Sequence, residues 1–294
     1  MTDLITIAND HLTAQINPLG AELTSLKDAD GRELMTAADP AFWPRHAPLL
    51  FPAIGKTAHG TIRVDGTEYS MKQHGFARRM VFAVSEQQPG SVAFTLEATP
   101  ETRAVYPFDF RLTVTFALVG ATLSVDVAIT NPAAQPLPAS FGFHPAFAWP
   151  LPYGQDRADH RIVFSADEPD TLRMIADDGT IAEGERPSPL EGRTLPLHDA
   201  LFAKDALVWD SVRSDSVTYG AETGPQLRID FPDTPMLGIW TKPGAAYVCV
   251  EPWHGIADPE GYTGDYRAKP GVFEIAASGT KTITMSVTLV ATAR

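Results

Sequence analysis

One stretch of the sequence decides the fold class: Leu112-Thr-Val-Thr-Phe-Ala-Leu118-Val-Gly120-Ala-Thr-Leu123-Ser-Val-Asp-Val-Ala-Ile129. On both sides of Gly120, apolar residues alternate with polar or small ones. A period of two sends alternate side chains to opposite faces of a pleated strand, so each run has one apolar face. The glycine marks a turn between the two runs. This stretch therefore predicts an antiparallel hairpin with one buried face.

The same alternation recurs near the end of the sequence, at Ile283, Met285, Val287 and Leu289, with Thr or Ser between them. A second hairpin is predicted for residues 61–69, where Asp65-Gly66 supplies a favoured two-residue turn. No stretch of twelve or more residues has a convincing helical period, although residues 39–43 and 196–202 allow short helical turns. We predict an all-β fold, a large antiparallel β-sandwich with few short helices.

Length and composition are typical of a folded chain with a sizeable core. The sequence has 294 residues, of which 44% are hydrophobic and 20% charged, and this balance excludes intrinsic disorder. The 25 prolines and 22 glycines are spread along the chain and do not gather into a linker. We therefore expect residues 1–294 to form one domain.

Charge and cysteine content exclude several classes of function. The 23 basic and 36 acidic side chains give a net charge of −13, which disfavours binding to nucleic acid or to an anionic membrane. The single cysteine cannot form a disulfide within the chain, and no CxxC or Cys/His cluster in the sequence suggests zinc. The first residues lack the pattern of a signal peptide, and residues 114–129 are too polar to span a bilayer. We expect a cytoplasmic monomer or homodimer.

Four segments combine histidine, arginine, tryptophan and carboxylate among aromatic, proline and glycine residues. They are Phe42 to Lys56, Gln73 to Arg78, Phe141 to Phe147 and Cys249 to Gly255. Such segments are typical of loops or strand ends held rigidly at a concave surface. Aromatic faces pack against the C–H surfaces of sugars, and Arg or His binds hydroxyl or phosphate groups. The residue chemistry therefore predicts a carbohydrate site.

Within these segments the motifs FPxxG, HGFAR, GFHPxF and CxEPW occur in this order. Together they resemble the aldose 1-epimerase (galactose mutarotase-like) superfamily, in the LacX-type branch that is related to the hexose-6-phosphate mutarotases. The resemblance extends from Gly20 to Trp253 and covers nearly the whole chain. It implies a large antiparallel supersandwich with a sugar site in a cleft across one sheet and no cofactor or metal.

The resemblance also implies a mechanism and the residues that perform it. Mutarotation opens a cyclic hemiacetal and closes it on the other face, which needs a base on the anomeric hydroxyl and an acid on the ring oxygen. Glu251 matches the base of the family and His144 matches the acid. His74 matches the histidine that binds the sugar near the ring oxygen, and Asp205 matches the carboxylate that accepts bonds from sugar hydroxyls.

Two arginines leave the substrate open. Arg45 and Arg78 align with arginines that contact phosphate in the hexose-phosphate branch, and guanidinium groups bind oxyanions through a fork. Two of them at one end of the cleft would select a 6-phosphate, although Arg78 could equally bind sugar hydroxyls or a carboxylate. Lys56 and Arg79 depart from residues common in relatives, which also leaves the identity of the sugar undecided.

The tryptophans and the cysteine complete the expected site. Trp253 and His254 are expected to line the cleft. The other four tryptophans are expected in the core or rim, at Trp43, Trp149, Trp209 and Trp240. Cys249 lies two residues before Glu251 on a predicted strand, so it should face the same side, as a small packing residue.

Three functions are compatible with these motifs. The first is an aldose 1-epimerase acting on a hexose or hexose 6-phosphate. The second is a non-catalytic carbohydrate-binding or sensing protein on the same fold, because fold does not determine function. The third is a glycoside hydrolase or lyase, which normally needs two carboxylates at one bond. The motifs pair one Glu with histidines and therefore favour the epimerase.

Overall fold

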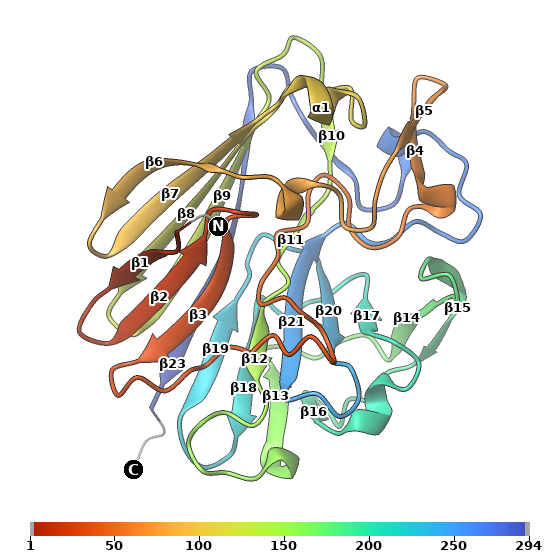
Figure 1. The fold of residues 1–294 in the computed structure, drawn as a ribbon. Coiled ribbons are helices and arrows are strands. Elements are labelled where there is room, and N and C mark those ends of the chain that lie inside the picture. Colours follow the sequence, from red (N-terminus) through yellow and green to blue (C-terminus); the bar gives the residue numbers. More distant parts are fainter. Residues whose placement is uncertain (1–2, 292–294) are drawn as a thin grey trace.

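The computed structural model describes residues 3–291, and its two largest sheets are antiparallel throughout (Figure 1). The nine-stranded sheet has the order β16 (Thr194–Pro196), β13 (His160–Phe164), β18 (Ser216–Ala221), β19 (Gln226–Asp230), β23 (Thr280–Val290), β9 (Thr122–Thr130), β8 (Arg111–Val119), β7 (Ser91–Glu97) and β6 (Ala83–Gln88). The seven-stranded sheet has the order β11 (Phe141–Gly142), β21 (Tyr247–His254), β20 (Met236–Trp240), β17 (Leu207–Trp209), β14 (Thr171–Ile175) and β15 (Ile181–Pro187), and β12 (Ala146–Ala148) also pairs with β21.

Three smaller sheets and six short helices complete the described structure. The small sheets are β1 (Ile5–Ala8), β2 (Leu12–Asn17) and β3 (Glu22–Asp28); β4 (Thr61–Val64) with β5 (Thr67–Ser70); and β10 (Leu137–Ala139) with β22 (Phe273–Ile275). The helices are α1 (Pro100–Arg103), η1 (Ala58–Gly60), η2 (Ala77–Arg79), η3 (Arg157–Asp159), η4 (Asp199–Phe202) and η5 (Tyr266–Ala268). Over residues 3–291, no helix has the length and apolarity needed to cross a membrane.

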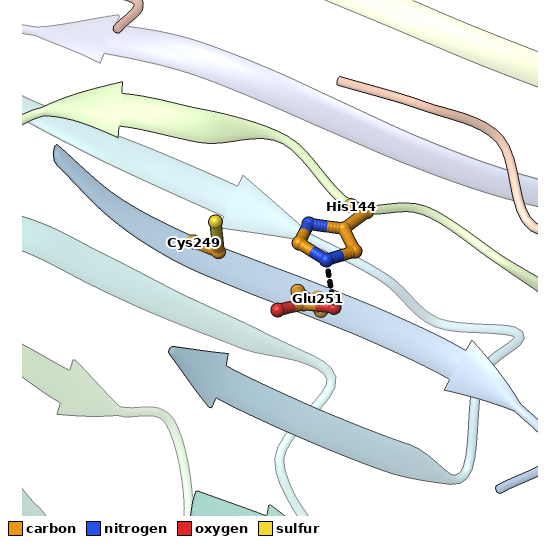
Figure 2. A group of neighbouring side chains, drawn as sticks. All are labelled: His144, Cys249 and Glu251. Carbon is orange, nitrogen blue, oxygen red and sulfur yellow. Dashed lines mark ion pairs between the residues drawn. The ribbon is translucent and has the colours of Figure 1, made fainter. Parts of the chain in front are cut away.

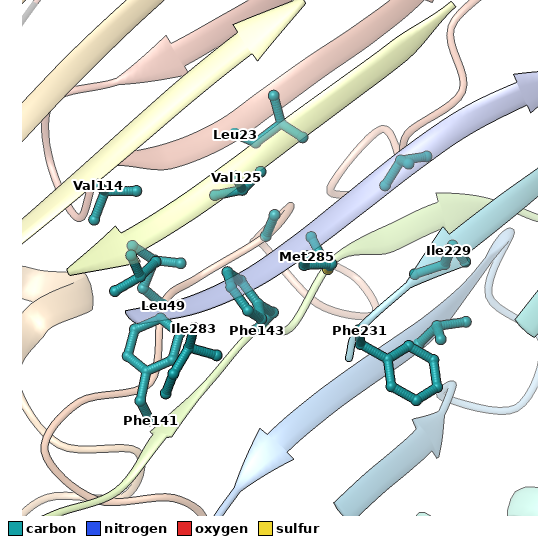
Figure 3. Packing of buried hydrophobic residues seen from close by; sticks show 14 of the residues in the cluster. Leu23, Leu49, Val114, Val125, Phe141, Phe143, Ile229, Phe231, Ile283 and Met285 are labelled. Carbon is teal, nitrogen blue, oxygen red and sulfur yellow. The ribbon is translucent and has the colours of Figure 1, made fainter. Parts of the chain in front are cut away.

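The hairpin predicted from the alternating sequence is confirmed as β8 and β9. Leu112 pairs with Ile129 and Leu118 pairs with Leu123. The inward side chains of both strands are all buried, and burial of one Leu, Val or Phe contributes about 1.5–3 kcal/mol. The core that they join also takes residues from β3 and from the segment that contains Phe143 (Figure 3). The hairpin is thus a wall of the main core, as the pattern predicts.

The seven-stranded sheet has one face in the main core and the other face turned to a second, smaller set of apolar side chains. In β21, Val248 and Val250 belong to the main core. Cys249, Glu251 and Trp253 alternate with them and therefore face the opposite side. The face of the seven-stranded sheet that carries Glu251 is therefore not used by the main core and is available to form a site.

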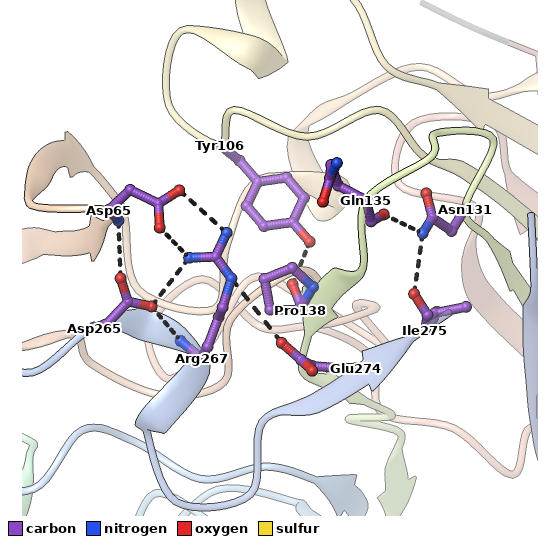
Figure 4. Close-up of polar contacts among 9 residues, drawn as sticks. All are labelled: Asp65, Tyr106, Asn131, Gln135, Pro138, Asp265, Arg267, Glu274 and Ile275. Atoms are coloured by element: carbon purple, nitrogen blue, oxygen red, sulfur yellow. Dashed lines mark hydrogen bonds and ion pairs between the residues drawn. The ribbon is translucent and has the colours of Figure 1, made fainter. Parts of the chain in front are cut away.

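Polar contacts also join segments outside the two large sheets (Figure 4). Arg267 in η5 pairs with Asp65 at 3.0 Å and with Asp265 at 3.4 Å, which holds the tip of the β4–β5 hairpin against η5. The Asn131 side-chain amide donates to the carbonyl oxygen of Ile275 at 3.0 Å, next to the β10–β22 pair. The Arg267–Asp65 and Asn131–Ile275 bonds connect segments more than a hundred residues apart in the sequence.

The other local expectations have mixed outcomes. The 61–69 hairpin is confirmed as β4 and β5, which turn at Asp65-Gly66. The helical turn expected within residues 196–202 is present as η4, whereas residues 39–43 form a hydrogen-bonded turn without a helix. Trp149 and Trp209 are buried in the main core, as expected. Trp43 and Trp240 lie elsewhere, as described below.

Gly75 lies in the loop before η2, where a neighbouring backbone segment leaves no room for a side chain. Its φ is +68°, and a Cβ at this position would lie 2.1 Å from the Phe51 carbonyl oxygen. Gly75→Ala should therefore cost more than the about 1–2 kcal/mol of a left-handed alanine alone. Gly66→Ala is the matched control, because its φ is +81° but no atom lies within 4 Å of the added Cβ. Urea unfolding of both variants measures the difference, and equal losses would contradict the close approach.

Candidate active site

His144 and Glu251 are opposite each other on adjacent segments. Gly142 in β11 pairs with Trp253, and Ala146 in β12 pairs with Cys249, so the same register places residue 144 across from residue 251. Side chains directly across an antiparallel pair share a face and lie close together. The His144 Nε2 atom lies 3.2 Å from the Glu251 Oε2 atom (Figure 2). Backbone pairing therefore brings together a potential acid and a potential base.

Burial changes the protonation of both groups. His144 is 6% exposed, and burial lowers the pKa of its imidazole to about 3. Glu251 is 2% exposed, and burial together with the negative charge of Asp205 raises the pKa of its carboxyl well above the ordinary value. The two sites are coupled, so their titration belongs to the pair. Both shifts favour the uncharged form of the pair, in which the carboxyl holds the proton, and the 3.2 Å contact allows that proton to pass to the imidazole.

The orientation of His74 is fixed by backbone. Its φ is +62°, and its Nδ1 atom accepts a hydrogen bond from the Gly55 N–H at 3.1 Å. Nδ1 therefore lacks a proton, and the hydrogen of the neutral ring is assigned to Nε2. Burial and the positive charges of His144 and Arg78 lower the pKa of His74 well below its ordinary value. His74 thus presents a neutral N–H donor, which lies 3.3 Å from the Gln73 side-chain amide. Its ring meets that of His144 edge-on at 5.7 Å.

These side chains share a cavity of about 320 Å³, a volume within the range of small-molecule sites. Its polar lining is Gln73, His74, Arg78, His144, Asp205 and Glu251. Its apolar and aromatic lining includes Trp43, Ile54, Ile175, Ile181, Val208, Trp240 and Trp253. The cavity therefore joins convergent polar groups to aromatic faces, which is the combination that a sugar requires.

Trp253 lies flat across the sheet because its neighbours have no side chains. A Cβ added to Gly238 in β20 would lie 2.5 Å from the six-membered ring of the indole, and one added to Gly142 in β11 would lie 2.5 Å from its five-membered ring. The indole thus extends from one neighbouring strand to the other. Trp253 lines the cavity, as the sequence predicts.

Two tryptophans correct the sequence analysis, because Trp43 and Trp240 line the cavity and are not only packing residues. The Trp43 indole stacks on the imidazole of His144, with ring centres 4.8 Å apart and an angle of 22° between the planes. Trp240 meets the same imidazole edge-on at 6.1 Å. Trp43 lies in the first of the four unusual segments, so its place in the sequence was a usable signal.

The two arginines are in different positions. Arg78 lines the cavity and donates through Nη2 to the Gln73 carbonyl oxygen at 2.9 Å. Arg45 lies behind it, with Nη1 at 3.2 Å from Glu22 and 3.3 Å from the Arg78 carbonyl oxygen. The expected convergence of two guanidinium groups on one end of the cleft is therefore absent, because the Glu22 carboxylate holds one of them.

His254 does not line the cavity. It follows Trp253 in β21, so the period of two turns it to the opposite face of the sheet. There its ring meets Phe273 edge-on at 4.6 Å. The expectation that His254 lines the cleft is therefore wrong, because the same alternation that places Cys249 on the side of Glu251 turns His254 away from it.

Asp205 lines the cavity from the loop between η4 and β17. Its φ is +69°, a left-handed conformation that Asp adopts more readily than most residues. One carboxylate oxygen, Oδ1, accepts the N–H of Ala206 at 2.7 Å, which orients the side chain. The structure thus places five of the predicted site residues in one cavity with Glu251: His74, Arg78, His144, Asp205 and Trp253.

Comparison with known proteins identifies the class. The sequence profile of the family described as aldose 1-epimerase matches residues 3–260, so this chain belongs to the aldose 1-epimerase family. The family consists of carbohydrate epimerases, which are isomerases. The chain is 33% identical over 268 residues to the chromosomal LacX protein of Lactococcus lactis subsp. lactis, a match that covers 86% of this chain and 88% of LacX.

Solved structures agree with this assignment. A galactose mutarotase related enzyme from Lactobacillus acidophilus superposes with a TM-score of 0.91 and 30% identity, covering 99% of this chain and 98% of that one. A galactose mutarotase-like protein from Lactobacillus casei has a TM-score of 0.89 and 32% identity, covering 98% of this chain and 100% of that one. The all-β, mutarotase-like sandwich expected from the sequence is confirmed.

The raised pKa of Glu251 predicts a gain in stability for Glu251→Gln. A carboxyl whose folded pKa lies above its unfolded value stabilises the protein at low pH and loses that contribution as pH rises from about 4.5 toward the folded value. The amide does not titrate, so the variant should gain on the wild type between pH 5 and pH 8. Urea unfolding in the presence of a chelator measures the difference at each pH.

The matched control is Glu168→Gln, another buried glutamate. Its carboxylate accepts the N–H groups of Arg213 and Ser214, each at 2.8 Å, so amidation should destabilise the protein at pH 8. A Glu251→Gln effect that does not depend on pH would contradict the raised pKa.

Proposed function

We propose that this chain interconverts the α and β anomers of an aldose by general acid–base catalysis. The observation that carries the proposal is the buried contact of 3.2 Å between His144 Nε2 and Glu251 Oε2 in the wall of the cavity. An exchangeable proton between a carboxylate and an imidazole is what ring opening of a hemiacetal needs. The membership of the aldose 1-epimerase family supports the same reaction.

The reaction can be written with the two side chains alone. Once the proton of the pair has passed from the carboxyl to His144, ionised Glu251 removes the proton from the anomeric hydroxyl, and the electron pair forms the carbonyl bond at C1. The bond between C1 and the ring oxygen breaks, and protonated His144 gives its proton to that oxygen. Rotation about the C1–C2 bond and the reverse transfers close the ring on the other face. Because one proton enters as another leaves, the pair carries one proton before and after ring opening.

The surrounding residues would orient the sugar for this step. His74 presents a neutral Nε2–H, which suits a sugar oxygen acceptor, and Asp205 presents a carboxylate, which suits hydroxyl donors. The indole faces of Trp253 and Trp43 exclude water and pack against C–H surfaces. Positioning of this kind would keep the ring oxygen near His144 and the anomeric hydroxyl near Glu251.

We further propose that the preferred sugar carries a phosphate. Within residues 3–291, no ion pair joins Arg78 to a carboxylate, and the positive charges of Arg78, Arg79 and Lys56 all act on His74. This local positive field stands out in a chain with a net charge of −13. A related protein, 28% identical over 46% of this chain and 43% of its own length, is described as a putative glucose-6-phosphate 1-epimerase from Cenchrus ciliaris.

Anomer exchange measured by NMR saturation transfer tests the reaction. Wild-type protein should accelerate exchange of at least one member of a panel of glucose, galactose and their 6-phosphates. Glu251→Gln should lower the rate about 10²–10⁴-fold, the usual contribution of one acid–base group. Glu168→Gln, the buried control, should retain the rate. Binding without accelerated exchange would instead assign a non-catalytic sugar-binding protein.

The role of Arg78 is tested by Arg78→Met on the same panel. A charge-assisted hydrogen bond contributes about 1.5–3 kcal/mol, so kcat/KM for the 6-phosphates should fall about 10- to 100-fold. The values for the neutral sugars should change much less. Arg111→Met, which alters an exposed arginine on β8, is the control. Equal losses for neutral and phosphorylated sugars would contradict the assignment.

A further inference from the structure

Three side chains with metal-binding atoms lie close together, His144, Cys249 and Glu251 (Figure 2). Two of them, His144 and Glu251, line the cavity. One ligand atom from each lies within 4.8 Å of the other two. The arrangement follows from the backbone, because Cys249 and Glu251 are two residues apart on β21 and His144 faces Glu251 across the pair. No local motif indicates this group, because residue 144 is more than a hundred positions from the other two.

The donor set and its spacing suit one particular class of ion. Imidazole, thiolate and carboxylate are the three ligand types of Zn²⁺ in proteins, whereas Mg²⁺ and Ca²⁺ take oxygen ligands. Donors bound to one tetrahedral Zn²⁺ lie about 3.3–3.8 Å apart, because each bond is about 2.0–2.3 Å long. The present separations, 3.2 Å for His144–Glu251 and at most 4.8 Å for the others, therefore need only small side-chain movements.

The charges of the three side chains and the route from the cavity are also compatible with a bound divalent cation. Cys249 is fully buried and Glu251 is 2% exposed, so an isolated anion at either position is unfavourable. A Zn²⁺ ion that displaces a proton from each would leave the group of three ligands neutral overall. His144 and Glu251 border the cavity, which supplies a route of entry and room for water or a sugar hydroxyl as the fourth ligand.

We propose that zinc-class divalent ions bind His144, Cys249 and Glu251 and thereby inhibit the site. The ion occupies the space between the acid and the base and takes the lone pairs that both need for proton transfer. Binding follows from the donor geometry alone, whereas inhibition rests on the proposed function. Cys249 has no part in the proton transfers, so its removal separates metal binding from catalysis.

Spectroscopy with Co²⁺ tests the binding without reference to activity. Chelator-treated wild-type protein, titrated with Co²⁺, should show a thiolate-to-cobalt charge-transfer band with a stoichiometry of one, and Zn²⁺ should displace it. Cys249→Ala and Cys249→Ser should both lack the band. His254→Gln is the matched control, because His254 lies on the opposite face of the same strand, and this variant should keep the band.

Anomer exchange then tests inhibition. Micromolar Zn²⁺ should suppress exchange by the wild type, and Mg²⁺ at the same concentration should not. Cys249→Ala should retain the exchange rate in chelator and need more than tenfold higher Zn²⁺ for the same inhibition, because losing a ligand costs at least as much as the 10- to 100-fold loss typical of second-shell changes.

Each negative result has its own meaning. Absence of the band in the wild type, or its persistence in Cys249→Ala, overturns the metal site. Equal zinc sensitivity of wild type and Cys249→Ala overturns the inhibition through these ligands. A band that depends on Cys249 in a protein that accelerates no sugar exchange supports the metal site and contradicts the proposed function.

Discussion

The antiparallel register between β21 and the segment of residues 141–148 is the constraint on which the site depends. Pairs on either side of residue 144, at Gly142–Trp253 and Ala146–Cys249, leave one place opposite Glu251. A slip of one residue would exchange the faces of the whole strand, so that Glu251 would point into the main core and Val250 into the cavity. The apolar alternation of β21 opposes such a slip, and the stability of the core therefore secures the geometry of the site.

The two large sheets serve this arrangement differently. The nine-stranded sheet provides the apolar wall on which the seven-stranded sheet packs, with strands whose inward residues are almost uniformly buried. The seven-stranded sheet uses only one of its faces for that packing. Its other face carries a carboxyl that burial destabilises in its ionised form, beside an imidazole that burial destabilises in its protonated form. The free energy of folding offsets the cost of holding these two groups close together and away from water.

Local patterns in the sequence predicted much of the fold and part of the site. Alternation around Gly120 and the Asp65-Gly66 turn depend on neighbouring residues only, so both hairpins were predictable. Glu251 and His144 were named from motifs that resemble a family, and the structure brings them into contact. The resemblance supplied the roles of base and acid. Their contact follows from the register of strand pairing, which no local pattern in the sequence shows for residues a hundred positions apart.

Three expectations for the site, for Arg45, Trp43 and His254, differ from what the structure shows. Arg45 was misplaced because its partner, Glu22, is distant in sequence and buried. The place of Trp43 in an unusual segment indicates a role at the site, but its stacking on the imidazole of residue 144 depends on a contact between residues 101 positions apart. For His254 the local pattern is sufficient, because the period of two turns its side chain to the face of the strand opposite Glu251.

The glycines beneath Trp253 have a consequence for how substrate preference can change in this protein. Gly142 and Gly238 carry no side chains, and the flat indole occupies the space that theirs would take. The floor of the cavity is therefore shaped by two glycines that take no part in the proposed proton transfers. A single methyl group there would tilt the ring and alter the outline offered to a sugar, and it would also move the indole N–H that acts on the Glu251 carboxyl. Selectivity and reactivity are thus linked through one indole, whose face shapes the cavity floor and whose N–H acts on the carboxyl of residue 251.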